Sequence, residues 1–417
     1  MRPISSLSCE AELKQAIHAI AADQAAMLET LVKWSAINSG SRNLSGLRQM
    51  EEAVLAYAKP LGAEVVFEDL PVTESVRADG TLEQRENGRS IRLIKRPNAV
   101  RRVLLTGHTD TVFPAESAFQ TAKLTEGGAL HGPGVADMKG GILVMLRALA
   151  AFESLLEKDT LGWEVLLSPD EETGSLASGP LLAERARTAH IGLTYEPALP
   201  DGTLAGQRKG SGNFSVVIKG VAAHAGRSFH DGRNAVVHAA SLAQALASLT
   251  GMRPGLTLNV SAIEGGSAPN VVPDLAVLRF NIRLTDIEDL EPVEDAVQDI
   301  IEQYNAAQGF SVQLHGQINR PPKVISKEGS ALMELVKTCG ASLGLPIAYV
   351  ATGGCCEGNN LAAAGLPNVD TLGVRGALIH SDKEYMIPES LSERASLSLL
   401  ILAAFHEGHL DKALGLA

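Results

Sequence analysis

Short apolar segments that end in histidine or acidic residues recur along this chain, and they constrain its fold more than any other feature. Three of them, residues 102–106, 163–167 and 191–195, have the length and composition of buried parallel strands. A helical run over residues 140–156 separates the first two. Strands that alternate with helices predict an α/β domain with a mostly parallel sheet flanked by helices.

The pattern changes between residues 210 and 321. There we expect strand 214–219, helix 234–249, strands 256–263 and 275–284, helix 289–307 and strand 310–314. This βαββαβ order is that of a ferredoxin-like unit. Beyond Arg320-Pro-Pro322 we expect helix 330–343, strand 369–374 and a last helix ending near residue 405. The sequence therefore predicts one discontinuous domain, residues 1–209 and 322–417, interrupted by a smaller inserted domain at residues 210–321.

Charge and composition exclude several partners. The chain has 36 Lys and Arg against 48 Asp and Glu, a net charge of −12, and no basic run. Such a chain is a poor candidate for binding nucleic acid or an anionic membrane. Four cysteines without CxxC spacing favour a reducing compartment. No signal-peptide pattern opens the sequence, and no apolar stretch is long enough to span a bilayer. We expect a cytoplasmic protein with no nucleic-acid or membrane partner.

Histidine and acidic residues follow the predicted strands or precede a helix. They are His108, Asp110, Asp137, Glu171, Glu172, Glu196 and His380. In open α/β sheets ligands bind at the carboxyl ends of the strands, so we expect these side chains to meet there. Imidazole and carboxylate groups are ligands for Zn²⁺. Two histidines and three carboxylates are too many for one open tetrahedral site, and they fit two metal ions that share a bridging ligand.

Two spacings within this set suggest further roles. Asp110 can accept the second N–H of His108 in a strand-to-loop turn and so fix the imidazole tautomer. Glu171 and Glu172 are adjacent, and successive side chains of extended backbone diverge. One of them can bind a metal ion while the other acts as a general base, and the spacing leaves open which does which. Cys355 and Cys356 have no evident catalytic partners and are expected to form an inert buried pair.

The segments GHTDTVFP, GVADMKGG, SPDEETGS and YEP, with the late His380, resemble a known family. It is the di-zinc metallopeptidase family that contains glutamate carboxypeptidase, acetylornithine deacetylase, succinyl-diaminopimelate desuccinylase and aminoacylase. The motifs occur in the family's order from about residue 20 onward, and the glutamate carboxypeptidase branch is the most similar. The resemblance implies a phosphorylase/hydrolase-like catalytic domain interrupted by a ferredoxin-like lid domain.

The resemblance also implies roles at the metal site. Two Zn²⁺ ions are expected per subunit, which Co²⁺ or Mn²⁺ can replace. His108 and Glu196 would hold one ion, Glu172 and His380 the other, and Asp137 would bridge them. Glu171 would be the general base that acts on a metal-bridging hydroxide, and Asp110 would orient His108.

Further residues are implied for the substrate. In the lid, GVAAHAG contains His224, which in many relatives reaches the partner subunit's site and stabilises the oxyanion. SAPNVVPD and NIRL contain Asn270 and Arg283, which would bind a substrate carboxylate. Gly354 lies in the pocket-lining loop TGGCCEGNN, whose Cys355, Cys356 and Glu357 depart from the family's small residue and Asp.

The implied function is zinc-dependent hydrolysis of the amide bond in small N-acylated amino acids or peptides with a free C-terminal carboxylate. Glu196, where some relatives have Asp, is typical of the carboxypeptidase and deacylase members. Helix 234–249 is apolar on nearly all sides, so we expect a homodimer formed through the lid. Within the family, an N-acyl amino acid deacetylase or a carbamoyl-amide hydrolase is the alternative. A non-catalytic metal-binding scaffold is a remote one, because the general base and all five ligands are present.

Overall fold

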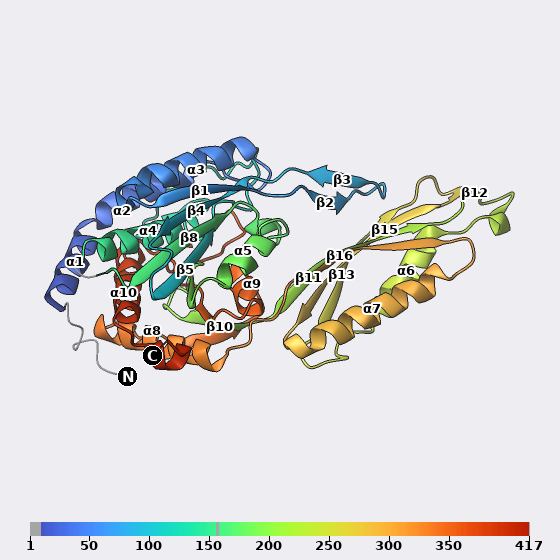
Figure 1. Ribbon diagram of the computed structural model, residues 1–417. Helices are drawn as coiled ribbons and strands as arrows, with labels where there is room; N and C mark the ends of the chain where they lie inside the picture. The colour runs from blue at the N-terminus through green and yellow to red at the C-terminus, as the bar shows by residue number, and fades with distance from the viewer. Residues whose placement is uncertain (1–9, 156–157, 417) are drawn as a thin grey trace.

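A six-stranded sheet forms the centre of the larger domain in the computed structural model, which describes residues 10–155 and 158–416 (Figure 1). In sheet order the strands are β1 (Glu64–Asp69), β4 (Arg89–Lys95), β8 (Leu161–Ser168), β5 (Arg101–His108), β9 (Ile191–Thr194) and β18 (Asn368–Val369). The pairs β8–β5, β5–β9 and β9–β18 are parallel, whereas β1–β4 and β4–β8 are antiparallel. The carboxyl ends of β8, β5 and β9 therefore lie at one edge.

Helices cover both faces of this sheet. One face packs against α1 (Glu10–Ala22), α2 (Gln24–Ser35), α3 (Leu44–Ala58), α4 (Lys139–Glu153), α8 (Lys327–Ser342) and α10 (Ser390–His406). The other packs against α5 (Gly179–Ala186) and α9 (Glu357–Ala363), and α11 (Asp411–Leu414) ends the chain. Helix α4 is apolar on nearly every side and is buried almost throughout, as such a pattern predicts. Among the described residues no helix combines the length and the hydropathy needed to cross a bilayer.

One predicted strand of this domain is wrong. Residues 369–374 were expected to be extended, but only Asn368–Val369 pair with β9. Thr371 has a φ of 61°, which takes the chain out of the extended region. Leu372 and Val374 are fully buried all the same. An apolar run here marks a buried loop rather than a strand.

The lid domain has the predicted βαββαβ order. Its elements are β11 (Gly210–Lys219), α6 (Ala235–Ala247), β13 (Thr257–Gly265), β15 (Leu275–Leu284), α7 (Leu290–Asn305) and β16 (Ser311–Arg320). The antiparallel sheet, ordered β13-β15-β11-β16, has a core of its own with α6 and α7 on one face. A short ribbon, β12 (Ala223–His224) with β14 (Val271–Val272), lies at the end of the lid farthest from the larger domain (Figure 1).

Two buried cations on one carboxylate fix both chain crossings into the lid. Arg208 ends β10 (Leu204–Arg208), which pairs with β17 (Tyr349–Thr352), and it makes two 2.9 Å hydrogen bonds to Asp370. Lys323, just after the lid, donates to Asp370 at 2.7 Å. Burial would raise the pKa of Asp370, but these two cations lower it. The carboxylate therefore stays ionised and holds both crossings.

A hairpin reaches from the larger domain to the lid (Figure 1). It consists of β2 (Thr73–Val76) and β3 (Leu82–Arg85). Val76 is buried against Val217 and Val277, on the lid sheet face that α6 and α7 leave open. Arg279 donates to the carbonyl of Val76 at 2.9 Å. The hairpin therefore joins the two domains at a place distant from the chain crossings.

Val76→Asp should release the hairpin from the lid. A carboxylate buried among valines costs more than the ~1–3 kcal/mol of a neutral unsatisfied group, so the side chain should leave the contact for solvent. We expect faster hydrogen exchange in β2 and β3 and faster tryptic cleavage at Arg77 and Arg85, with exchange in β5 and β8 unchanged. Val72→Asp, at an exposed position beside the hairpin, is the control. Equal behaviour of the two variants would show that the Val76 contact does not hold the hairpin.

Candidate active site

Three of the predicted clusters lie at the carboxyl ends of neighbouring strands. His108 is the last residue of β5, and Glu196 follows β9 by two residues. Glu171 and Glu172 lie in a single 3₁₀ turn, Glu171–Thr173, just after β8. Because β5 and β8 are parallel with His108 opposite Ser168, the three clusters come together at one edge of the sheet.

Asp137 and His380 reach the same place from outside that sheet. Asp137 lies two residues before α4, after β7 (Leu130–His131), and His380 follows β19 (Gly376–Ala377). With β20 (Tyr385–Met386) and β6 (Lys123–Leu124), these strands form a separate four-stranded sheet. The α4 crossover begins at the edge where β5 ends, so Asp137 still faces His108.

Buried Glu384 shapes the Asp137 loop. Its carboxylate accepts hydrogen bonds from the backbone N–H groups of Gly134 at 3.1 Å, Ala136 at 2.9 Å and Asp137 at 3.0 Å. Sequence reasoning missed Glu384, although it lies in the same IHSDKEY segment as His380. Its role is visible only once that segment is placed against the loop.

Asp137 lies between the two histidines. Nε2 of His108 is 3.1 Å from one oxygen of Asp137, and Nε2 of His380 is 3.2 Å from the other. His380 is also 3.2 Å from Glu172, and His108 is 3.7 Å from Glu196. The two oxygens of one carboxylate thus face two separate groups of potential ligands, which is the geometry that a bridging ligand needs.

The charges of this cluster fit bound cations. Burial and the charge of Asp137 raise the pKa of Glu172 to about 8 and that of Glu196 well above its usual range. One buried oxygen of Glu196 has no hydrogen-bond partner among the described residues. Imidazole nitrogen and carboxylate oxygen are ligands that Zn²⁺ accepts, and metal ions would remove the repulsion between these acids. The residues therefore fit a metal site.

The hydrogen bonds of His108 define its tautomer. Nδ1 lies 3.0 Å from the backbone carbonyl of Asp110, which can only accept, so Nδ1 carries the proton. Nε2 is then left free to bind a metal ion. The carboxylate of Asp110 is 3.3 Å from Nδ1 and also accepts from the backbone N–H groups of Glu171 and Glu172. Asp110 thus connects His108 to the adjacent glutamates.

Arg320 distinguishes Glu171 from Glu172, and sequence reasoning missed it. Its Nη2 lies 2.7 Å from a carboxylate oxygen of Glu171 and donates to the Glu171 carbonyl at 2.7 Å. Glu172 instead contacts His380. Oxygens of both glutamates lie within 4.8 Å of ligand atoms from His108 and another acid. The sequence marked Arg320 only as a domain boundary, because its contact with Glu171 spans 149 residues.

A cavity of about 690 Å³ opens over this cluster. Asp137, Glu171, Glu172, Glu196 and His380 line it, together with Arg208, Arg283, Arg320, Gly354, Cys355 and Cys356. The expectation of a buried cysteine pair is wrong for Cys355, which is half-buried at the cavity wall, whereas Cys356 is buried. Within the described residues, His224 and Asn270 are not part of the lining; they lie in or beside the β12–β14 ribbon.

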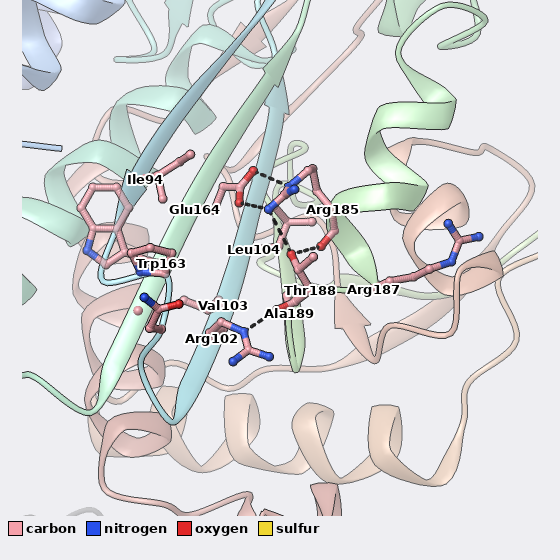
Figure 2. A pocket seen from close by; sticks show the side chains of 13 residues that line it. Ile94, Arg102, Val103, Leu104, Trp163, Glu164, Arg185, Arg187, Thr188 and Ala189 are labelled. Atoms are coloured by element: carbon pink, nitrogen blue, oxygen red, sulfur yellow. Dashed lines mark hydrogen bonds and ion pairs between the residues drawn. The ribbon is translucent and has the colours of Figure 1, made fainter. Parts of the chain in front are cut away.

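Another hollow, of about 470 Å³, lies at the opposite edge of the main sheet (Figure 2). It is formed at the amino ends of β5 and β8 and beside the end of α5. Figure 2 shows Arg185 directed at Glu164, to which it is bonded at 3.0 Å through two nitrogens. Arg102 donates to the Thr188 carbonyl. Arg185 and Glu164 thus neutralise each other, and we place the function at the other edge, where the His and carboxylate cluster lies.

A family model supports the same conclusion. The model for "Peptidase family M20/M25/M40" matches residues 104–404, which include the whole His and carboxylate cluster. The chain belongs to this family. Its members are metal-dependent hydrolases, so the M20-family protein described here is an enzyme of that class, and the predicted family is confirmed.

Known proteins resemble the chain over most of its length. Carboxypeptidase G2 from Pseudomonas sp. is 27% identical over 386 residues, 91% of this chain and 89% of that protein. Succinyl-diaminopimelate desuccinylase from Verminephrobacter eiseniae is 26% identical over 306 residues, 69% and 75% of the two chains. An M20 family metallo-carboxypeptidase from Sulfolobus solfataricus has a TM-score of 0.71 at 16% identity, covering 91% of this chain and 99% of that one. The predicted fold class is confirmed.

Glu171→Gln and Glu172→Gln should separate the two adjacent glutamates. If Glu171 is the base, its amide variant keeps its metal content and loses roughly 10²- to 10⁴-fold in turnover, because an amide cannot accept the proton. Glu172→Gln should lower the metal content itself, since a ligand charge is lost. Metal analysis of the purified variants, alongside turnover, makes the comparison. If Glu171→Gln loses metal while Glu172→Gln keeps its full metal content, Glu171 is the ligand and Glu172 the base.

Proposed function

We propose that this enzyme is a two-zinc hydrolase that cleaves the amide bond of small N-acylated amino acids or peptides with a free C-terminal carboxylate. One observation carries the proposal: a single cavity holds both the His and carboxylate cluster and Arg283, a cation with no carboxylate partner among the described residues. The names of two relatives, a carboxypeptidase and a desuccinylase of an amino acid, agree with such a substrate.

Arg283 is held in place without being neutralised. Its Nε donates to Oδ1 of Asn281 at 2.9 Å, and its Nη1 donates to Sγ of Cys355 at 3.2 Å. Asn281 is in turn fixed by donating to Ser211 at 3.1 Å and to the Gly212 carbonyl at 3.0 Å. A guanidinium so oriented can bind a carboxylate through two parallel hydrogen bonds. We assign it to the C-terminal carboxylate of the substrate, with Gly354 in the adjoining loop.

The proposed metal ligands follow the geometry of the cluster. His108 and Glu196 would hold one zinc ion, Glu172 and His380 the other, and Asp137 both. When bound, the two ions supply Lewis acidity that activates a water molecule and polarises the scissile carbonyl. Asp110 keeps the proton of His108 on Nδ1, so that Nε2 faces the metal position.

Glu171 would move the proton. It accepts a proton from the attacking water as the new C–O bond forms at the carbonyl carbon. It then donates that proton to the nitrogen of the leaving amine as the C–N bond breaks, leaving a carboxylic acid and a free amine. Arg320 positions the Glu171 carboxylate for both transfers through its 2.7 Å contact. Because Glu171 is buried, little bulk water competes for the proton.

His224 would act in the partner subunit. It is exposed, and the β12 ribbon that carries it lies at the far end of the lid, away from its own chain's metal cluster (Figure 1). Asn270 adjoins the same ribbon, and its backbone carbonyl accepts a hydrogen bond from the backbone N–H of Ala225 at 2.9 Å. Helix α6 exposes Val237 to 63%. We propose that residues 210–321 form the lid and dimerisation domain and bring these groups to the other site.

A substrate panel tests the proposed function. The zinc-loaded full chain is assayed with N-acetyl, N-benzoyl, N-carbamoyl and N-succinyl amino acids and with dipeptides, each beside its C-terminal amide. We expect zinc-dependent release of the amino acid, slower by at least roughly tenfold when the carboxylate is amidated. No turnover by the fully loaded protein, or equal turnover of acids and amides, would contradict the proposal. The N-acetyl and N-carbamoyl members test the alternatives within the family.

Mixing two inactive variants tests the dimer. A chain with His224→Ala and a chain with Glu171→Gln are combined, and subunit exchange is verified. If His224 acts across the interface, each mixed dimer has one site with both natural groups and regains up to about half of the wild-type activity. If His224 acts within its own chain, every site lacks one of the two groups and no activity is regained. A monomer by light scattering would also defeat the idea.

A further inference from the structure

The active-site cavity has two chemically different walls. The lid contributes polar residues, among them Ser211, Asn213 and Arg283. Besides Thr203, Arg208, Thr352 and Thr371, the larger domain contributes a group of apolar residues that we call the apolar wall: Leu199, Ala205, Val350, Ala351 and Ile379. The His and carboxylate cluster adjoins both walls, since Ile379 directly precedes His380 in the sequence and Arg320 of the lid contacts Glu171.

Large apolar side chains of this wall are open to solvent. Leu199 is 48% exposed, Val350 is 46% exposed and Ile379 is 38% exposed. Val350 lies opposite Ala205 in the parallel β10–β17 pair, and Leu199 begins the turn that leads into β10. Single exposed apolar residues are ordinary, but three around one cavity that also contains the catalytic groups make an apolar surface for a ligand.

The charges of the cavity also favour an uncharged group at the apolar wall. Of its three arginines, Arg208 is bonded to Asp370 and Arg320 is paired with Glu171. Arg283 therefore remains as the arginine of the lining with no carboxylate partner in the described structure. One unpaired arginine can bind one substrate carboxylate, and Arg283 lies on the lid wall. On the side of the apolar wall, the arginine that the described structure places in the cavity is Arg208, and it is already paired with Asp370, so a second carboxylate would find no free cation there.

We infer that the apolar wall selects an uncharged, apolar acyl group on the substrate, an inference that rests on the function proposed above. With the amide at the metal cluster and the carboxylate at Arg283, the acyl group points to the other wall. Each buried methylene of an acyl chain should raise kcat/KM by roughly three- to fourfold. A terminal carboxylate placed there would lose its hydration without gaining a partner.

An acyl series on one amino acid tests this inference. N-acetyl, N-butanoyl and N-succinyl derivatives are compared, the last being a butanoyl group whose methyl is replaced by a carboxylate. The N-butanoyl compound should exceed the N-acetyl compound by roughly tenfold in kcat/KM and the N-succinyl compound by at least that factor. Val350→Lys, which adds a cation to the wall, should lower kcat/KM for N-butanoyl and raise it for N-succinyl substrate.

Matched variants separate the wall from other effects. Val65→Lys, at an equally exposed valine of β1 outside the cavity, should leave both substrates unchanged. Leu199→Lys should repeat the reversal seen with Val350→Lys. If the N-succinyl compound is hydrolysed as well as N-butanoyl by the natural chain, or if Val350→Lys alters both equally, the inference is overturned while the proposed function stands. If no N-acyl amino acid is hydrolysed at all, the proposed function falls and this inference with it.

Discussion

Repulsion among buried acids at one edge of the sheet is the constraint on which the rest of the active site depends. Asp137, Glu172 and Glu196 are brought within a few ångströms of two histidines, and burial raises the pKa of two of these acids. Such an arrangement is costly unless cations hold it. The fold supplies rigid support: α4 is buried nearly throughout, and Glu384 fixes the loop that carries Asp137. The chain is built to hold these acids together.

Buried ion pairs, in addition to the two chain crossings, connect the lid to this site. Arg208 and Lys323 meet on Asp370 beneath the cavity, and Arg320, at the end of the last lid strand, reaches Glu171. A change in lid position would therefore act on the group proposed to move the proton. The β2–β3 hairpin adds a contact on the open face of the lid sheet. The lid and the proposed general base are thus joined by the contact between Arg320 and Glu171, so movement of the lid is limited by this contact.

The two cavity walls face different parts of the proposed substrate. The lid wall carries the uncompensated charge of Arg283, and the larger domain carries the apolar wall. The loop with Gly354 and Cys355 adjoins both, because it directly follows Val350 and Ala351 in the sequence and Cys355 contacts Arg283. This is the loop in which the sequence departs from the family pattern. A substrate preference unlike that of a desuccinylase is consistent with that departure, since succinyl groups carry a second carboxylate.

The sequence by itself determined the elements, the family and the identity of the clustered residues. Buried strands 102–106, 163–167 and 191–195 are mostly apolar, so the histidine and acidic residues that follow them stand out. The same reasoning failed at residues 369–374, since burial alone does not distinguish a strand from a buried loop. Only the tertiary structure placed Arg320 on Glu171, Glu384 behind Asp137 and two cations on Asp370. Each of these contacts joins residues distant in sequence, and a buried ion pair or hydrogen bond leaves no local pattern of spacing or hydropathy from which its partner can be found.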